Sequence, residues 1–513
     1  MSEISSNNKR IAKNTMMLYI RMLLSTVVSL YTSRVVLQTL GVEDYGIYGV
    51  VGGVVAMFSF LNSTMAGATS RFLTFEMGKG DKERLKATFS SALIIHIGIA
   101  LLVLILAETV GIWFLNNKLV IPEGRMEAAH WVLQFSVLGM IVGFTQVPYN
   151  AAIIAHEKMD VYAYVELIHV FLKLGIVYLL WIGNFDKLIL YAFLTLVVNV
   201  IVAMIYRIYC IRHYEESKFN AHLDKDISKN ILSFSLYNLL GNLGVVVNTQ
   251  GTNFVINMFF GVVYNAAASI GTTISNVING FASNVLTAFK PQITKSYAQD
   301  NIPQFQSLIL WAIKSMLLLY SLIAIPVGFT IKEVLSLWLV VVPKYADVFC
   351  ILLLISTFFE ILRVIYVIAI HATGQVKVSG MTTGISLLLN PFIIFILFKM
   401  NLSPEYAYIS IIFINIFLSI LNLLILKHNE PRIQIKKFIL ITIQIITMLI
   451  FVMLVLNLVC QYKINKPLLD IIIIGSISSM LIIILGYYCV LNKPQREQII
   501  KIIKNKIKIQ SNK

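Results

Sequence analysis

The sequence predicts an all-α polytopic membrane protein with about 14 transmembrane helices. Three observations support this fold class. Of the 513 residues, 58% are hydrophobic and 13% are charged, whereas soluble domains carry roughly 25% charged residues. Apolar segments long enough to cross a hydrocarbon core of ~30 Å, about 20 residues each, recur along the whole chain. The longest polar insert, around residues 212–230, is too short to fold as a separate soluble domain.

Each predicted span is an apolar run bounded by polar or turn-forming residues. Pro148 and Pro326 fall inside the fourth and ninth runs, where they indicate kinks rather than ends. In chain order the runs cover residues 14–38, 45–70, 88–114, 130–155, 161–183, 187–210, 231–257, 262–288, 306–330, 346–370, 378–399, 405–426, 437–460 and 468–490.

Lysine and arginine collect in alternate loops, which predicts the orientation of the spans. Basic residues precede the first span, separate spans 2 and 3, flank the loop between spans 6 and 7, and follow spans 8 and 12. The opposite loops, such as 41–44 and 261–264, are short and poor in basic residues. The positive-inside rule then places both termini in the cytoplasm. The basic residues 491–513 form either an amphipathic helix on anionic membrane lipid or a solvated tail. No soluble module is present, so we do not expect nucleic-acid binding.

An internal repeat of about 220 residues relates the two halves of the chain. This shift aligns spans 1–2 with spans 7–8 and places Gly41-Val42 on Gly261-Val262, each in a tight loop. The predicted domains are therefore 1–215, 216–430, two additional spans in 431–490, and a basic cytoplasmic tail in 491–513. Substrate sites of transporters built from repeats lie between the halves.

The motif Leu40-Gly41-Val42-Glu43-Asp44-Tyr45-Gly46-Ile47-Tyr48 and the segment Phe289-Lys290-Pro291-Gln292-Ile293 resemble Wzx-type polysaccharide and O-antigen flippases. These belong to the multidrug/oligosaccharidyl-lipid/polysaccharide (MOP) exporter superfamily. The resemblance implies two six-helix, MATE-like bundles around a central cavity, two C-terminal helices, and a location in the bacterial cytoplasmic (inner) membrane. It also implies export of an undecaprenyl-diphosphate-linked oligosaccharide, an O-antigen or capsular repeat unit, with other polysaccharide-assembly membrane proteins as possible partners.

Rows of amides and hydroxyls on spans 7 and 8 are candidates to line a path for sugars. At about 100° per residue each row falls on one helix face, and a face of this kind is costly to expose to lipid. The alternative is hydrogen-bonded packing between helices. The candidate cavity-lining residues are Asn242, Asn253, Asn257, Asn276 and Asn279.

Cations at membrane depth are candidates to bind the diphosphate. A buried charge costs at least ~2.5–3.5 kcal/mol on insertion scales, so it needs a partner or a wet cavity, and a guanidinium fits phosphate oxygens bidentately. For Arg21 the alternative is a structural ion pair, and Glu360 is the expected partner of Arg363. The candidates are Arg21, Lys314, Arg363, Lys290 and Arg71.

Glu166, His169 and Lys173 share one face of the fifth span and are candidates for ion coupling. A histidine and a buried carboxylate can titrate near neutral pH, which suits a proton or sodium gradient. A self-neutralising structural cluster is the alternative. No metal or organic cofactor is expected.

The sequence contains no phosphate-cradling glycine loop, nucleophile constellation or paired catalytic carboxylates, so we do not expect an enzyme. The leading prediction is a flippase that works by alternating access. The alternatives are a lipid II flippase, a cation-coupled multidrug exporter of the same superfamily, and, from another class, a membrane glycosyltransferase or polymerase. The last is disfavoured because no sizeable extramembrane loop is present.

Overall fold

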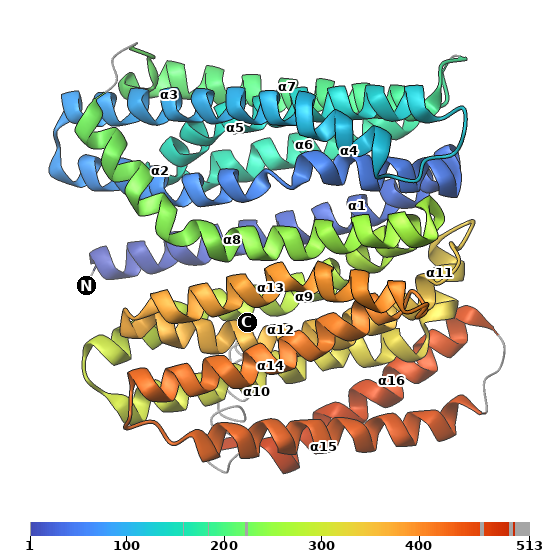
Figure 1. Ribbon diagram of the computed structural model, residues 1–513. Helices are drawn as coiled ribbons and strands as arrows, with labels where there is room; N and C mark the ends of the chain where they lie inside the picture. The colour runs from blue at the N-terminus through green and yellow to red at the C-terminus, as the bar shows by residue number, and fades with distance from the viewer. Residues whose placement is uncertain are drawn as a thin grey trace, which may run out of the picture. The chain divides into compact units, whose positions relative to one another are not determined.

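The computed structural model describes residues 2–156, 158–182, 184–220, 224–461, 466–491 and 496–497, and within them the protein is built from helices alone (Figure 1). The first half contains α1 (Ser2–Ala56), α2 (Ser59–Lys79), α3 (Lys82–Leu106), α4 (Ile112–Asn117), α5 (Met126–Ala155), α6 (Met159–Leu179) and α7 (Lys187–His213). The second contains α8 (Lys225–Phe260), α9 (Val262–Ala298), α10 (Ile302–Phe329), α11 (Ile331–Trp338), α12 (Ala346–Thr373), α13 (Val376–Lys399), α14 (Tyr406–Asn429), α15 (Ile435–Cys460) and α16 (Pro467–Leu485). Short π-helical segments at Ala107–Gly111 and Gly486–Val490 and a 3-10 helix at Glu215–Ser217 complete the described secondary structure.

The predicted fold class is confirmed, but the count of 14 spans is not. In the described part of the chain, 10 helices are long and apolar enough to cross a membrane. An eleventh span is formed if Leu24–Ala56 and Ser59–Met77, which are bent by 48° at their junction, are taken together. The helices α8 and α9, which carry the asparagine-rich faces, are not among the 10. Pro148 and Pro326 lie inside α5 and α10, which continue through them as predicted.

By compactness the chain divides into two units. Unit 1 comprises Met1–Ser269, Leu339–Ala346 and Gly380–Ala407, and unit 2 comprises Ile270–Trp338, Asp347–Ser379 and Tyr408–Lys513. The divisions fall within α9 and near the start of α13, so each of these helices contributes to both units. The predicted domain boundaries at 215 and 430 follow the repeat rather than compactness, and they stay a prediction.

Unit 1 is organised around α5, which packs against α1, α2, α3 and α7. The segment of α1 after Gly41 contributes Ile47, Val50 and Val51, all fully buried, to a core that also contains Val132 of α5. The valine and isoleucine side chains at this spacing therefore face the bundle interior, as expected for a helix with one apolar stripe.

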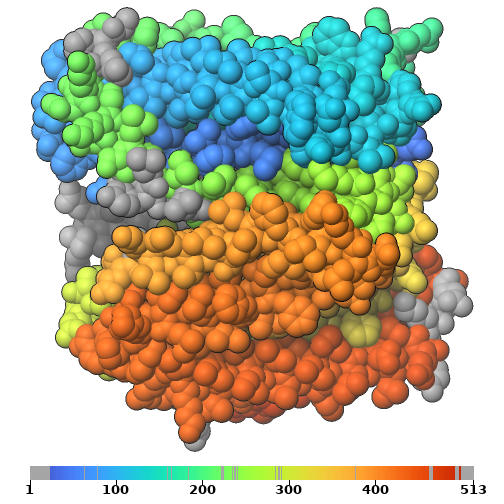
Figure 2. Space-filling model, in the orientation of Figure 1, coloured from blue at the N-terminus to red at the C-terminus, as the bar shows by residue number. Residues whose placement is uncertain are grey.

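In unit 2, α12 contacts four neighbouring helices. The Tyr320 hydroxyl of α10 donates a hydrogen bond to the carbonyl of Leu354 at 2.8 Å, and the Tyr366 ring lies against Phe438 of α15 at 6.3 Å between centroids. Side-chain hydrogen bonds also join α12 to α9 and α14. The visible face of unit 2 is formed by α14 and α15 (Figure 2). Both helices expose large apolar side chains, as expected of lipid-facing helices, among them Phe413, Phe417, Ile443 and Leu454.

The two turns that the repeat aligns have the same backbone conformation. Gly41 has φ 82° and ψ 171°, and Gly261 has φ 81° and ψ −176°. This region is essentially restricted to glycine. Each glycine joins two helical segments that are consecutive in the chain (Figure 1), so the same turn conformation recurs at the two positions that the predicted repeat aligns.

Candidate functional site

Asn257 and Asn253 on α8 take part in hydrogen bonds that hold the α8–α9 turn. Asn257 is fully buried. Its Oδ1 accepts from the Val120 N–H at 2.8 Å, and its Nδ2 donates to Asn265 at 2.9 Å and to the Val120 carbonyl at 3.3 Å. The Asn265 amide donates in turn to the Asn253 carbonyl at 2.7 Å. Both candidates therefore take part in packing within unit 1, and the half-buried Asn253 side chain keeps its amide available.

Two further amides of α8 bond to neighbouring helices in unit 1. Asn242 donates to the Thr64 hydroxyl of α2 at 2.8 Å. Asn248, which the sequence analysis did not single out, accepts from Asn390 of α13 at 2.7 Å. An ideal Cβ on Gly244 would lie 2.5 Å from the carbonyl oxygen of Gly384, so the backbones of α8 and α13 approach closely beside this bond. The glycine and asparagine spacing of α8 was the sequence signal for this contact.

The remaining polar candidates have exposed or half-buried side chains. On α9, Asn276 is exposed and Asn279 is half-buried, both within unit 2. Lys290 near the end of α9 and Arg71 in the second half of α2 are exposed. Asn276 and Asn279 thus have accessible amides, while Lys290 and Arg71 are not at buried positions.

The three deepest candidate cations differ in what surrounds them. Arg21 lies on α1, but its side chain is outside the described part of the structure. Lys314 on α10 is 2% exposed, and Arg363 on α12 is 7% exposed. Both described cations belong to unit 2. Lys314 and Arg363 are thus basic residues buried in spanning helices, and their role as diphosphate contacts stays a prediction.

The predicted pair of Arg363 with Glu360 is confirmed, but the contact is long. Arg363 Nη2 lies 3.5 Å from Glu360 Oε1, compared with about 2.7–2.9 Å for a charge-assisted hydrogen bond. The Arg363 side chain is 9% exposed and that of Glu360 is 40% exposed. Arg363 Nε is buried and has no hydrogen-bond partner among the described residues. The guanidinium is therefore incompletely satisfied.

A polar seam on α14 holds α12 below this pair, and the sequence analysis missed it. Asn415 Nδ2 donates to the Ser356 hydroxyl at 3.0 Å, and the Ser419 hydroxyl donates to the Phe359 carbonyl at 3.1 Å. One turn further along α14, Asn422 Oδ1 accepts a hydrogen bond from the Ser379 hydroxyl of α13. The i, i+4, i+7 spacing of 415, 419 and 422 was the available signal, because those positions share one helix face.

The three ion-coupling candidates on α6 lie close together. Lys173 is within electrostatic range of both Glu166 and His169. His169 Nε2 is buried without a hydrogen-bond partner in the described part of the chain, whereas the Lys173 side chain is exposed. The structure therefore brings the cluster together, and its role in coupling stays a prediction.

A charged network joins three segments of unit 1 outside the spanning cores. Arg125, just before α5, binds Asp44 bidentately, with Nε–Oδ1 at 2.8 Å and Nη2–Oδ2 at 2.5 Å. Its Nη1 also donates to Asp186 at 2.5 Å. Asp186 caps α7 by accepting from the Leu188 and Ile189 N–H groups. Partial burial tends to raise the Asp186 pKa, but the bonds from Arg125 and the α7 backbone outweigh it and hold the pKa below its ordinary value.

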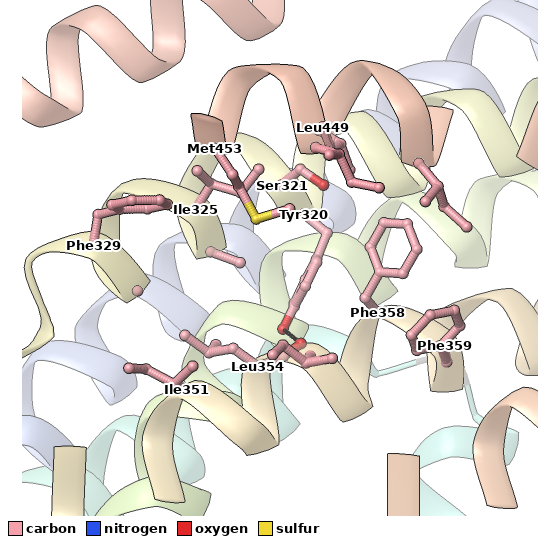
Figure 3. Close-up of a pocket in the computed structure, with 15 residues that line it drawn as sticks. Tyr320, Ser321, Ile325, Phe329, Ile351, Leu354, Phe358, Phe359, Leu449 and Met453 are labelled. Carbon is pink, nitrogen blue, oxygen red and sulfur yellow. Dashed lines mark hydrogen bonds between the residues drawn. The ribbon is translucent and has the colours of Figure 1, made fainter. Parts of the chain in front are cut away.

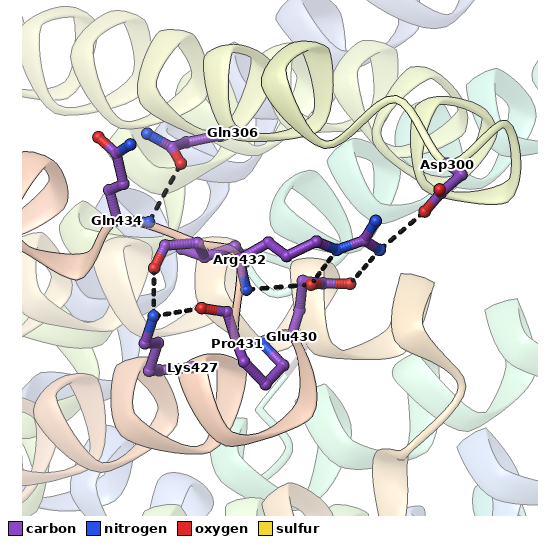
Figure 4. A network of polar contacts seen from close by, with 8 residues as sticks. Asp300, Gln306, Lys427, Glu430, Pro431, Arg432 and Gln434 are labelled. Carbon is purple, nitrogen blue, oxygen red and sulfur yellow. Dashed lines mark hydrogen bonds and ion pairs between the residues drawn. The ribbon is translucent and has the colours of Figure 1, made fainter.

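A second network, in unit 2, fixes the linker between α14 and α15 (Figure 4). Arg432 donates to Glu430 at 2.8 and 2.9 Å and to Asp300, between α9 and α10, at 2.7 Å. Lys427 Nζ caps the carbonyls of Pro431 and Ile433. Arg432 holds the pKa of both carboxyls below their ordinary values. Residues 427–433 thus form an ordered connection to the C-terminal helix pair.

Unit 2 also contains an apolar pocket of about 590 Å³ between α10, α12 and α15 (Figure 3). Its walls include Phe329, Phe358 and Met453, and the one phenol among its lining residues, Tyr320, already donates to the Leu354 carbonyl. These apolar walls can bind hydrocarbon, but they offer too few hydrogen-bond partners for a sugar or a diphosphate. The pocket is therefore not the headgroup site.

The sequence matches the profile of a family described as "Polysaccharide biosynthesis protein" over residues 9–287, more than half of the chain. A curated relative, "Uncharacterized membrane protein EpsK" of Bacillus subtilis (strain 168), is 20% identical over 321 residues. This alignment covers 62% of the chain and spans 63% of the length of that relative.

Among solved structures, the chain is similar to "Lipid II flippase MurJ, inward closed conformation", with a TM-score of 0.66 and 14% identity, covering 92% of this chain and 99% of that one. It is also similar to the "Inward-facing conformation of a multidrug resistance MATE family transporter of the MOP superfamily", with a TM-score of 0.64 and 15% identity, covering 82% and 100%. At such identities these similarities establish a common fold.

Proposed function

The chain belongs to the polysaccharide biosynthesis protein family, and on that premise we propose that it is a flippase for an undecaprenyl-diphosphate-linked oligosaccharide. It moves the headgroup from the cytoplasmic to the periplasmic leaflet of the bacterial inner membrane by alternating access, with both termini in the cytoplasm. The multi-span membrane fold and the family support the transporter class. The assignment of the substrate rests on the chemistry of the residues inside the spans.

The observation that carries the substrate assignment is the buried, incompletely paired guanidinium of Arg363. A buried cation is retained at a cost unless an anion satisfies it. Glu360 satisfies Arg363 with a single contact of 3.5 Å, so donors remain for a second acceptor. A diphosphate provides several acceptor oxygens in the geometry that a guanidinium fits. Arg21, Lys314, Lys290 and Arg71 are the further proposed contacts.

Neutral polar groups suit the sugar portion of the substrate. Asn276 and Asn279 have accessible amides on α9, and amides both donate to and accept from hydroxyls. We assign the same role to Asn242 and Asn253, in addition to their packing bonds, whereas Asn257, fully buried and already bonded through both of its amide atoms, holds the α8–α9 turn. The polyprenyl chain stays in the lipid. The Glu166–His169–Lys173 cluster is the proposed site of coupling to a proton or sodium gradient.

The test is export in cells that lack the native protein. Arg363→Ala should slow export by roughly ten- to hundredfold at unchanged membrane levels, because a charge-assisted hydrogen bond contributes about 1.5–3 kcal/mol. Arg363→Lys should recover only part of the loss, since an ammonium lacks the planar fork. The control is Arg212→Ala, at an exposed position near the end of α7.

Full export by well-expressed Arg363→Ala would contradict the proposed phosphate contact. Complementation of a lipid II flippase deficiency, without export of polysaccharide, would replace the proposed oligosaccharide with a cell-wall precursor.

A further inference from the structure

The contact between Glu360 and Arg363 has the geometry of a replaceable partner rather than a permanent ion pair. The two residues are three positions apart on α12 and meet through one contact of 3.5 Å. The arginine is nearly buried, at 9% side-chain exposure, while the carboxylate is 40% exposed. The carboxylate is therefore much less enclosed by protein than the guanidinium it contacts.

Arg363 has donor capacity that Glu360 leaves unused. A guanidinium has five N–H donors, and the buried Nε has no hydrogen-bond acceptor among the residues that the structure describes. Leaving a buried donor unsatisfied costs free energy. An oxyanion with more than one oxygen would satisfy more of these donors than the single oxygen of Glu360 does.

The backbone of α12 is held in place around this pair, so the exchange needs side-chain motion only. Ser356 accepts from Asn415 of α14, and Thr357 shares a hydrogen bond of 2.7 Å with Ser275 of α9. The Phe359 carbonyl accepts from Ser419. These bonds join α12 to two neighbours within the turn before Glu360.

We propose that Glu360 is a built-in substitute for the substrate's phosphate: it occupies Arg363 in the empty protein and is displaced when a diphosphate binds. This inference rests on the proposed function. Two anions at one guanidinium repel each other, so the carboxylate and the phosphate compete. The Glu360 carboxylate compensates the buried charge of Arg363 when no substrate is present. Its competition with the phosphate also weakens substrate binding, so that the diphosphate can leave after it has crossed the membrane.

The experiment measures equilibrium binding of undecaprenyl diphosphate to the full chain in lipid nanodiscs, with inorganic pyrophosphate as a second probe. Glu360→Gln keeps the side-chain size and removes the competing charge, so it should bind undecaprenyl diphosphate more tightly, by about 5-fold or more. Arg363→Gln should lose most binding. When Glu360→Gln is combined with Arg363→Gln, it should give no gain in affinity, because the arginine that binds the phosphate is absent. The matched control, Glu83→Gln, removes an exposed carboxylate from α3 and should leave affinity unchanged.

Each outcome decides between the inference and its premise. If Arg363→Gln loses binding but Glu360→Gln binds equally or more weakly, Glu360 positions the arginine rather than competing, and the inference alone is overturned. If the wild-type chain binds neither probe, both the proposed substrate class and the inference about Glu360 are wrong. Binding of pyrophosphate alone would place the recognition in the phosphates without the lipid. Thermal unfolding of each variant separates loss of binding from loss of the fold, and a gain of affinity cannot arise from misfolding.

Discussion

Arg125 contributes to the structure through three chain segments that are far apart in sequence. It joins the turn after Gly41, the start of α5 and the cap of α7 by way of Asp44 and Asp186. The side chains of the three charged residues are 17–32% exposed. They are therefore shielded enough from water for the pairing to exceed the small contribution of a surface salt bridge.

Arg125→Met should lower the free energy of unfolding by about 1–3 kcal/mol, because it leaves two partly buried carboxylates facing each other. The measurement is thermal or denaturant unfolding of purified protein in detergent. Glu123→Gln, at an exposed position in the same loop, should change little. Equal stability of both variants would mean that the network contributes no more than ordinary surface charges.

Contacts between residues close in sequence were predictable, and those between distant residues were not. The Glu360–Arg363 pair follows from i, i+3 spacing on a helix, and the sequence predicted it. Asn415 and Ser356 are 59 positions apart, and nothing in a single sequence specifies which faces of α12 and α14 meet. For the same reason the Arg125 network was not predicted, although its residues are conspicuous loop charges.

At the scale of helices, the segment of α1 after Gly41 packs through a face of glycines. An ideal Cβ on Gly46 would lie 2.1 Å from the carbonyl oxygen of Val262, at the start of α9. One on Gly53 would lie 2.7 Å from Gln250 Oε1 of α8. Small residues on one face permit such close approach of helices in membranes. Gly52, beside this face, has open space around it.

Gly46→Ala should therefore destabilise the protein by about 1–3 kcal/mol, because the new methyl group meets backbone and the helices must separate. Gly52→Ala is the matched control. It should be neutral or stabilising by up to about 1 kcal/mol, because alanine has the higher helix propensity. Both are measured by thermal unfolding in the same detergent. Equal behaviour of the two variants would refute the close approach at Gly46.

The linker before α15 should loosen in acid. Arg432 holds the pKa values of Asp300 and Glu430 below their ordinary values of 3.8 and 4.5. The contribution of these carboxylates is therefore complete above about pH 4.5 and is lost as the pH falls through the lowered values. Hydrogen exchange of residues 427–435 should be slow at pH 7 and should accelerate, after correction for intrinsic rates, below pH 4. Arg432→Gln should give the accelerated exchange already at pH 7, and an unchanged rate would contradict this role of the network.

For the whole molecule, loop charge predicts which ends face the cytoplasm. A reporter enzyme active only in the periplasm should give signal when fused after Asp44 and none when fused after Lys436, because basic loops stay inside. Fusion protein levels are measured in parallel. Signal after Lys436 with none after Asp44 would reverse the orientation and place the Arg432 network on the periplasmic side.

Much of the fold could be read from the sequence, because hydrocarbon thickness imposes helices of a minimum length and rules out exposed strands. The turns at Gly41 and Gly261 were readable because a backbone with positive φ favours glycine. The number of spans was harder to read from the sequence than the fold class. The helices α8 and α9 carry many polar residues and are not among the 10 described helices that are long and apolar enough to cross a membrane. The division into units was not readable, because it depends on how α9 and α13 pack along their lengths.

The matching turns at Gly41 and Gly261 also bear on the history of the chain. Their dihedral angles agree closely, although the residues around them have few identities. Duplication of an ancestral half of about 220 residues would leave such a trace, because drift can replace almost any lipid-facing side chain but not a residue whose backbone only glycine tolerates. The two turns are therefore the natural landmarks for aligning the halves of distant homologues, even where the rest of the helices has diverged beyond recognition.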